Sequence, residues 1–208
     1  GLDAYLPRLI ANAVIDFKRD KNVLDYHEIL VTLAGDHPNS EAVNLLGQLY
    51  LDLGYYQGAR VLFERMVRVH PRSSTAAVWV TRARYLSGDI MGAREALTIA
   101  ELRDPNSPQV FQINALENVS TYEPATCDQQ MELALHQSRI QEAILLLNCI
   151  SGSWLYPPMW MQASDVPWQK FSHSEEYLAH RNRLGFSLEA ADRLPLVDAE
   201  QLLAPRRD

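Results

Sequence analysis

The sequence contains no apolar run long enough to cross a membrane. Every stretch falls short of the roughly 18 consecutive apolar residues that a spanning helix needs. The first twenty residues mix both signs of charge into an amphipathic pattern, which is not the pattern of a signal peptide. We therefore expect this segment to insert into no membrane. A targeting segment or a further domain encoded upstream would be invisible in it.

A surplus of positive charge is also missing. The 208 residues include 19 lysines and arginines against 26 aspartates and glutamates, so the formal net charge is −7. An acidic protein is repelled by the phosphates of nucleic acids and by acidic membrane surfaces. We expect no direct contact between this segment and nucleic acid.

The residue patterns of common active sites and cofactor sites are absent. The six histidines form no HExxH motif and no paired spacing of metal ligands. The nine glycines are scattered, so there is no glycine-rich phosphate loop, and Gly152-Ser153-Trp154 does not continue into a GxSxG nucleophile elbow. We predict a protein that is not an enzyme and has no catalytic residue, no metal and no cofactor.

Cysteine is scarce, and its two positions leave two interpretations. Cys127 and Cys149 lie on adjacent predicted helices, equally far in sequence from a turn near Ser138, so antiparallel packing could bring them to similar heights. Free cysteine is among the most buried residue types, which favours reduced thiols in a cytoplasmic protein. The alternative is a Cys127–Cys149 disulfide, which would indicate the periplasm.

What the sequence does contain is an internal repeat. Gly54 recurs as Gly88, Ala59 as Ala93 and Pro71 as Pro105, with a spacing of 34 residues in each pair. This period is typical of the tetratricopeptide repeat (TPR), a helical hairpin that cannot bury its apolar face alone and therefore stacks on its neighbours.

The repeat is clearest over residues 40–71. Its first helix has Leu46, Gly47 and Tyr50 where such repeats place a large, a small and an aromatic residue, and its second helix has Ala59 and Phe63. We expect the two helices to cross closely at the small residues, with the large ones filling the space beside the crossing. A left-handed glycine at position 54 is expected to end the first helix.

The flanking repeats follow the pattern less closely. Residues 74–107 keep its landmarks but place Thr81 where the glycine stood, and residues 6–39 place Ala13 at the small position and Ile29 at the large one. Residues 108–150 fit two registers. One predicts a hairpin over 108–137, with Ala115 and Cys127 at small positions and Pro124 opening the second helix. The other places Ala143 at the alanine position of a later hairpin.

The helical periodicity stops after Ile150. Three tryptophans and three prolines crowd into about twenty residues, and a helix is expected from Ser174 to Leu184. We predict an all-α fold in which about four antiparallel hairpins (residues 1–150) stack in a right-handed superhelix, capped by an irregular segment (residues 151–208). The aromatic residues of that segment are interpreted as the cap or, alternatively, as a docking site: Trp154, Trp160, Trp168 and Phe171.

The end of the chain supplies a narrower resemblance. A large apolar residue, then a phenylalanine, a polar turn and a helix ending in Arg-x-x-Leu-Gly-Phe resembles the end of TPR effector regions in ToxR/CadC-like bacterial winged-helix regulators. The matching residues are Trp168, Phe171, Ser172, Glu175, Tyr177, Leu178, Arg181, Leu184, Gly185 and Phe186. The resemblance implies a non-catalytic interaction, sensory or oligomerising module of such a regulator. A stand-alone TPR adaptor and a TPR region attached to a bacterial adenylate cyclase are the alternatives.

A binding face can be predicted from the repeat. In TPR arrays the concave wall is formed by the first helices, and the residues expected on it here include Asn44, Gln48, Leu51, Arg82, Tyr85 and Gln112. Their amides, arginine and tyrosine could hydrogen-bond an extended peptide. We expect a protein or peptide partner, or a homodimer, and a cytoplasmic location, with the periplasmic domain of a membrane-anchored regulator as the alternative.

Overall fold

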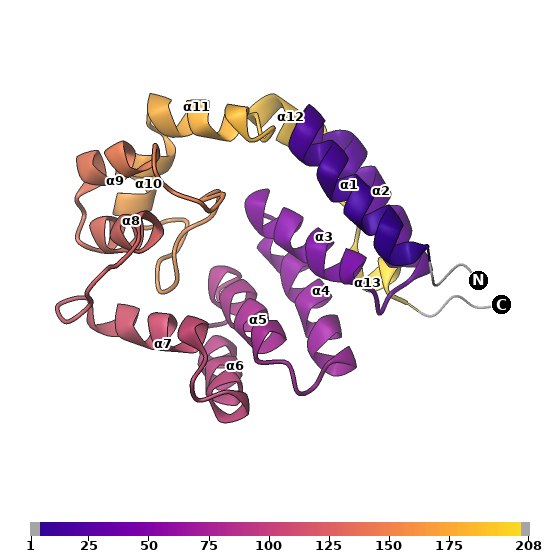
Figure 1. Cartoon of the computed structure of the whole chain (residues 1–208), viewed down its shortest axis with the longest axis horizontal. Helices are drawn as coiled ribbons and strands as arrows, with labels where there is room; N and C mark the ends of the chain where they lie inside the picture. The colour runs from indigo at the N-terminus through magenta and orange to yellow at the C-terminus, as the bar shows by residue number, and fades with distance from the viewer. Residues whose placement is uncertain (1–4, 205–208) are drawn as a thin grey trace.

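A computed structural model describes residues 5–204, and within that range all regular structure is helical (Figure 1). The prediction of an all-α protein is thereby confirmed. Residues 1–4, at the start of the predicted repeat segment, and residues 205–208, at the end of the predicted capping segment, lie outside the described range. The helices are α1 (Leu6–Asp20), α2 (Val23–Asp36), α3 (Glu41–Asp52), α4 (Tyr56–Val69), α5 (Ser74–Leu86), α6 (Ile90–Arg103), α7 (Pro108–Ala115), the short 3₁₀ helix η2 (Leu116–Asn118), α8 (Cys127–His136), α9 (Ile140–Leu146), α10 (Val166–Ser172), α11 (Glu175–Arg183), α12 (Leu188–Asp192) and α13 (Ala199–Leu202).

Consecutive helices pack in pairs, α1 with α2, α3 with α4, α5 with α6 and α8 with α9 (Figure 1). Glycine ends the first helix of two pairs, as expected. Gly54 has φ +77° and Gly88 has φ +90°, both in the left-handed region. After each glycine the next amide reaches back to a carbonyl of the helix, Tyr55 to Tyr50 (2.8 Å) and Asp89 to Arg84 (2.9 Å). These bonds complete the helix-ending motif that a left-handed residue permits.

The crossing of α3 and α4 is as close as the small residues predict. A Cβ atom added to Gly47 would lie 2.8 Å from Cε1 of Phe63, inside van der Waals contact. Ala59 and Phe63 are fully buried, as are Leu46 and Tyr50 beside them. The bare backbone of Gly47 is therefore what lets the phenyl ring occupy the crossing.

The first pair departs from the repeat by one residue. Ala13 is buried as expected, but Ile29 is 39% exposed, and the neighbouring Leu30 is fully buried in its place. α1 extends to Asp20, further than the repeat predicts from the end of α3 at Asp52, so α2 begins at Val23, one residue later than the repeat would place it. The prediction that Ile29 fills the large position was wrong because this shift moves the buried stripe along the helix.

Residues 108–150 adopt the later of the two registers. Ser138 has φ +59° and occupies the position of the turn glycine, and the Arg139 amide reaches back to the Ala134 carbonyl (2.8 Å). Ala143, at the alanine position, is fully buried. The hairpin over 108–137 is wrong, because the chain after η2 is irregular and Cys127 opens a first helix, α8, capped by Thr126.

The C-terminal segment, here residues 151–204, returns across the molecule and closes it (Figure 1). Both α12 and α13 pack on α2, and α13 also packs on α4. The Val197 amide donates a hydrogen bond to the Tyr50 hydroxyl on α3 (3.3 Å). One hydrophobic core accordingly includes buried residues from Ile10 near the start of the chain to Ala199 near its end.

The Arg-x-x-Leu-Gly-Phe motif forms part of this closure. α11 begins after its cap Ser174, as predicted, and ends before Gly185, whose φ is +88°. A Cβ atom on Gly185 would lie 2.4 Å from the Lys21 carbonyl oxygen, so the backbone itself touches the α1–α2 turn. Phe186 then packs edge-on against Phe17 of α1, with ring centroids 5.7 Å apart. The motif therefore docks the end of the chain on its beginning.

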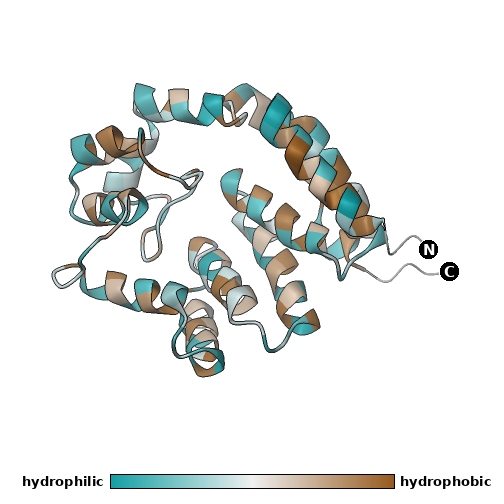
Figure 2. Cartoon of the chain, in the orientation of Figure 1, coloured by the Kyte–Doolittle hydropathy of each residue, from teal (hydrophilic) through white to brown (hydrophobic). Residues whose placement is uncertain are grey.

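None of the helices within residues 5–204 combines the length and apolar character required to cross a membrane. Figure 2 shows hydrophilic and hydrophobic residues interleaved along the long helices, as expected where one stripe of each helix is buried.

Candidate functional site

The first part of the C-terminal segment, residues 151–165, lies on the face formed by the first helices α3, α5 and α7, which we call the inner face. The Ser153 hydroxyl donates to Asp52 at the end of α3 (2.9 Å), and the Gln162 side chain donates to the Tyr85 carbonyl at the end of α5 (2.8 Å). The Trp160 indole N–H donates to the Ile113 carbonyl on α7 (2.8 Å). The protein therefore covers much of its predicted binding face with its own chain.

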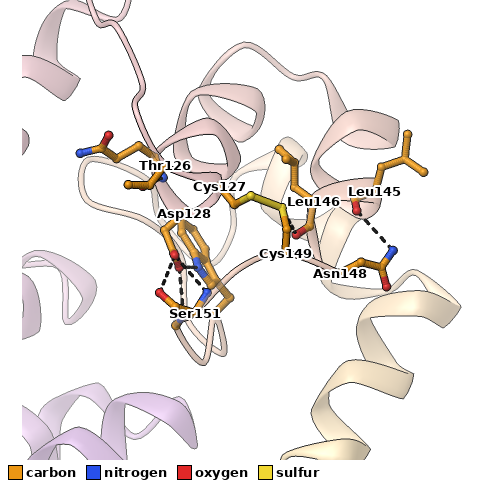
Figure 3. The surroundings of a disulfide bond; sticks show 11 residues. Thr126, Cys127, Asp128, Leu145, Leu146, Asn148, Cys149 and Ser151 are labelled. Atoms are coloured by element: carbon orange, nitrogen blue, oxygen red, sulfur yellow. Dashed lines mark hydrogen bonds between the residues drawn. A yellow bond between two sulfur atoms is a disulfide. The ribbon is translucent and has the colours of Figure 1, made fainter.

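A disulfide between Cys127 and Cys149 holds the start of this segment (Figure 3). The two Cα atoms are 5.9 Å apart, because α8 and α9 are antiparallel neighbours. The favoured interpretation, a pair of buried thiols, was wrong on both counts. Cys149 is exposed and Cys127 only half-buried, since these residues begin α8 and follow α9 rather than sit in the middle of a helix pair.

Asp128 reinforces the same anchor. Its carboxylate accepts four hydrogen bonds: from the amide of Ser151 (3.0 Å), from the hydroxyl of Ser151 (2.7 Å), from the amide of Gly152 (2.9 Å) and from the indole of Trp154 (2.7 Å). Burial would raise the pKa of Asp128, but these donors hold that pKa at about 2. The carboxylate is therefore charged at neutral pH and keeps residues 151–154 beside α8 (Figure 3).

The aromatic residues of the C-terminal segment are engaged internally. Trp154 and Trp160 both have left-handed backbones, with φ +54° and +62°, and each is held by its indole hydrogen bond. Trp168 is 5% exposed and packs against Phe171 and Tyr177, with ring centroids 5.6 and 5.7 Å away. These contacts make the tryptophans part of the core and of the covered inner face.

Between the inner face and the C-terminal segment there is a cavity of about 140 Å³. Its lining comes from α5, α7, η2, α8 and the C-terminal segment, and comprises Thr75, Val78, Trp79, Arg82, Gln109, Gln112, Ile113, Leu116, Glu132 and Met159. Thr75 and Gln109 are exposed and form its rim, whereas Val78, Ile113, Leu116 and Met159 are buried and form apolar walls. The cavity therefore has a polar opening and a mostly apolar interior.

Two of the predicted binding residues, Arg82 and Gln112, line this cavity. The other four do not. Asn44 bonds to Glu41 on its own helix (2.7 Å) and Leu51 is fully buried. Tyr85 packs edge-on against Trp160, at 5.2 Å between ring centroids, and Gln48 lies beside residues 151–153. The structure thus separates a cavity at α5, α7 and α8 from the rest of the inner face.

Glu132 is a buried acid at the cavity wall. It is 5% exposed, and its carboxylate accepts hydrogen bonds from the Gln112 amide (2.5 Å) and the Tyr122 hydroxyl (3.4 Å). Burial raises the pKa of Glu132 above its ordinary value. The acid is therefore satisfied by neutral donors of the protein itself.

Arg82 is the opposite case. Its Nε atom is buried and has no hydrogen-bond partner, and no ion pair joins its guanidinium to any acid within residues 5–204. The guanidinium carbon lies 6.0 Å from the ring centre of Trp79 and 5.4 Å from that of Tyr156. Aromatic faces attract a cation, and the Tyr156 hydroxyl interacts with the guanidinium as well: burial raises the pKa of Tyr156, and Arg82 partly offsets that rise. Neither group gives Nε an acceptor, so this one donor of Arg82 is unused.

Comparison with known proteins gives no relative. The chain matches no protein-family model, no curated protein and no solved structure.

Several residues that shape the cavity were not predicted from the sequence. Glu132 had a usable signal, because it is a lone charge between Met131 and Leu133 on a helix with apolar neighbours. Met159 had none, since it comes from a loop that only the closed fold brings to α7. Within residues 5–204, no group of three or more His, Cys, Asp or Glu side chains could hold a metal ion.

Proposed function

We propose that this chain is a non-catalytic sensory module of a bacterial transcriptional regulator, similar to the TPR effector regions of the ToxR/CadC-like group. The 34-residue period and the C-terminal motif support this proposal, with the helix pairs stacked as a right-handed TPR superhelix. Of the roles that the resemblance implies, the geometry favours sensing a small molecule.

The observation behind this preference is that the inner face is already occupied. An extended peptide would have to displace the C-terminal segment, which is held by the disulfide, by Asp128 and by hydrogen bonds to α3, α5 and α7. The cavity beside Arg82 needs no such displacement. A concave site with apolar walls and a few convergent polar groups is the usual form of a small-molecule site.

The disulfide supports a periplasmic location for the module, as part of a membrane-anchored regulator. Disulfides persist in oxidising compartments and are rare in the bacterial cytosol. A winged helix encoded upstream would support the regulator, and an upstream cyclase domain would support the cyclase-linked form. The absence of both would support the stand-alone adaptor.

A thermal-shift screen of small organic acids, amines and neutral metabolites tests the sensory role. Compounds that bind the cavity stabilise the folded chain and raise its melting temperature. The matched control is Val78→Phe, which fills the cavity from its apolar wall. We expect compounds that stabilise the natural chain and not Val78→Phe. If every compound shifts both proteins equally, the cavity is not a sensory site.

A further inference from the structure

We infer that the cavity binds a small monocarboxylate, with the ligand carboxylate on the Arg82 guanidinium and its apolar part between Val78, Ile113, Leu116 and Met159. This inference rests on the proposed sensory function and names the ligand class of the same site.

The Nε–H group of Arg82 is a buried donor. Leaving a buried N–H without an acceptor carries a free-energy penalty, which is why nearly all such groups in proteins find a partner. The Nε of Arg82 has none. A carboxylate is the group that matches the planar, forked donors of a guanidinium and can take two parallel hydrogen bonds from it. The two aromatic rings near the guanidinium, of Trp79 and Tyr156, limit the directions from which that acceptor can approach.

Glu132 does not take the place of that carboxylate. Its Oε2 atom accepts from both Gln112 and Tyr122, and none of the ion pairs within residues 5–204 joins Glu132 to Arg82. The other oxygen, Oε1, remains open to a ligand, but an amine bound to it would place a second cation in the same small cavity as the Arg82 guanidinium, where like charges repel. The unpaired positive charge of Arg82 in this lining therefore favours an anionic ligand group over a cationic one.

The volume limits the rest of the ligand. A dry cavity of about 150 Å³ holds a benzene molecule, so about 140 Å³ accommodates roughly six non-hydrogen atoms. Four of the lining side chains are apolar and at most 7% exposed. Inorganic phosphate and sulfate would leave these walls without contacts, and a nucleotide exceeds the space. Short branched acids and small ring acids fit both limits.

Calorimetric titration of the intact chain with three compounds of one shape tests the inference. Isovalerate carries the carboxylate, isovaleramide replaces it by a neutral amide, and isopentylamine replaces it by a cation. We expect isovalerate to bind about 10- to 100-fold more tightly than the amide, because charge-assisted hydrogen bonds are the stronger ones. No binding is expected for the amine.

The variants separate charge from shape. Arg82→Gln should weaken isovalerate binding about 10- to 100-fold, and Arg82→Lys should retain part of it. The control Arg68→Gln removes an exposed arginine of α4 and should change nothing. Melting temperature and near-ultraviolet circular dichroism establish that each variant is folded. Because the amide is uncharged, its binding to a folded Arg82→Gln variant should be nearly unchanged.

Three results would overturn the inference: equal affinity for acid and amide, preference for the amine, or unchanged isovalerate affinity in Arg82→Gln. Failure of both isovalerate and isobutyrate to bind at millimolar concentration would also overturn it. If the amide or the amine binds the natural chain and not Val78→Phe, the sensory role stands and only the ligand class is wrong. If no compound of the screen distinguishes these two proteins, both proposals fail.

Discussion

Asp52, at the end of α3, accepts a hydrogen bond from the Ser153 hydroxyl of the C-terminal segment. Burial raises the pKa of Asp52 to about 7, although the Ser153 bond and the charge of Arg181 both lower it. The folded chain therefore favours the neutral acid, whereas the unfolded chain has an ordinary carboxyl that ionises near pH 4. The contribution of Asp52 to the free energy of unfolding is fully present below about pH 4 and is lost as the pH rises to about 7.

Replacing Asp52 by asparagine should remove that dependence. Asparagine keeps an oxygen for Ser153 but cannot ionise, so Asp52→Asn should flatten the stability profile between pH 5 and pH 8. At pH 8 the variant should be more stable than the natural chain by about 1 to 3 kcal/mol, a range that allows for partial solvent screening. Urea denaturation at several pH values measures both profiles. Parallel profiles would show that Asp52 ionises normally in the folded protein.

Among the helix pairs, the close crossing of α3 and α4 predicts the effect of a substitution at Gly47. Alanine at Gly47 would place a methyl group 2.8 Å from a buried ring atom of Phe63. Overpacking costs about 1 to 3 kcal/mol, partly offset by about 1 kcal/mol of better helix propensity. Gly47→Ala should therefore lower the free energy of unfolding by up to about 2 kcal/mol in chemical denaturation.

A second substitution separates packing from other causes. In a Phe63→Leu background the aromatic ring is gone, so Gly47→Ala should become neutral or stabilising there. The coupling energy from this double-mutant cycle isolates the contact. The same loss in both backgrounds would mean that the ring is not the obstacle.

The helix pairs were predictable where local chemistry specifies them. Gly54 and Gly88 mark two turns because only glycine enters the left-handed region without strain, and Gly47, Ala59 and Phe63 mark the crossing. The register of residues 108–150 was not decided by the sequence, since Ser138 adopts a conformation that glycine usually signals. The disulfide was one of two alternatives for a different reason. Buried thiols and a disulfide are each compatible with adjacent antiparallel helices, and the choice depended on the redox compartment.

The path of the C-terminal segment could not be predicted, because it has no helical period. Its course depends on contacts between distant residues, such as Ser153 with Asp52 and Val197 with Tyr50. The cavity could not be predicted for the same reason. The repeat placed Arg82 and Gln112 on the inner face, but its closing residue, Met159, comes from that segment.

For the whole molecule, the disulfide and Asp128 provide two anchors within a few residues. Replacing both cysteines by serine opens a loop with a sequence separation of 22 and should lower the free energy of unfolding by about 3 kcal/mol. The segment should still hold its place, because Asp128 binds residues 151–154 independently. Denaturation with and without reductant measures the first effect, and the serine variant should not respond to reductant.

Limited proteolysis measures the second effect. We expect cleavage within residues 151–165 to accelerate only when the two cysteine substitutions are combined with Asp128→Ala, since either anchor alone retains the loop. Rapid cleavage of the cysteine variant by itself would show that the disulfide is the principal anchor.

The packing of α12 on α2, and of α13 on α2 and α4, affects how the molecule unfolds. A linear array of helical repeats has free ends, and its terminal units can fray while the middle stays folded. Here α12 and α13 hold the first pair, so α1 and α2 have neighbours on both sides. Opening this pair must break its contacts with α3 and with α12 and α13, and must release Phe186 from Phe17. We therefore expect the first pair to unfold together with the rest of the chain, as in a globular domain.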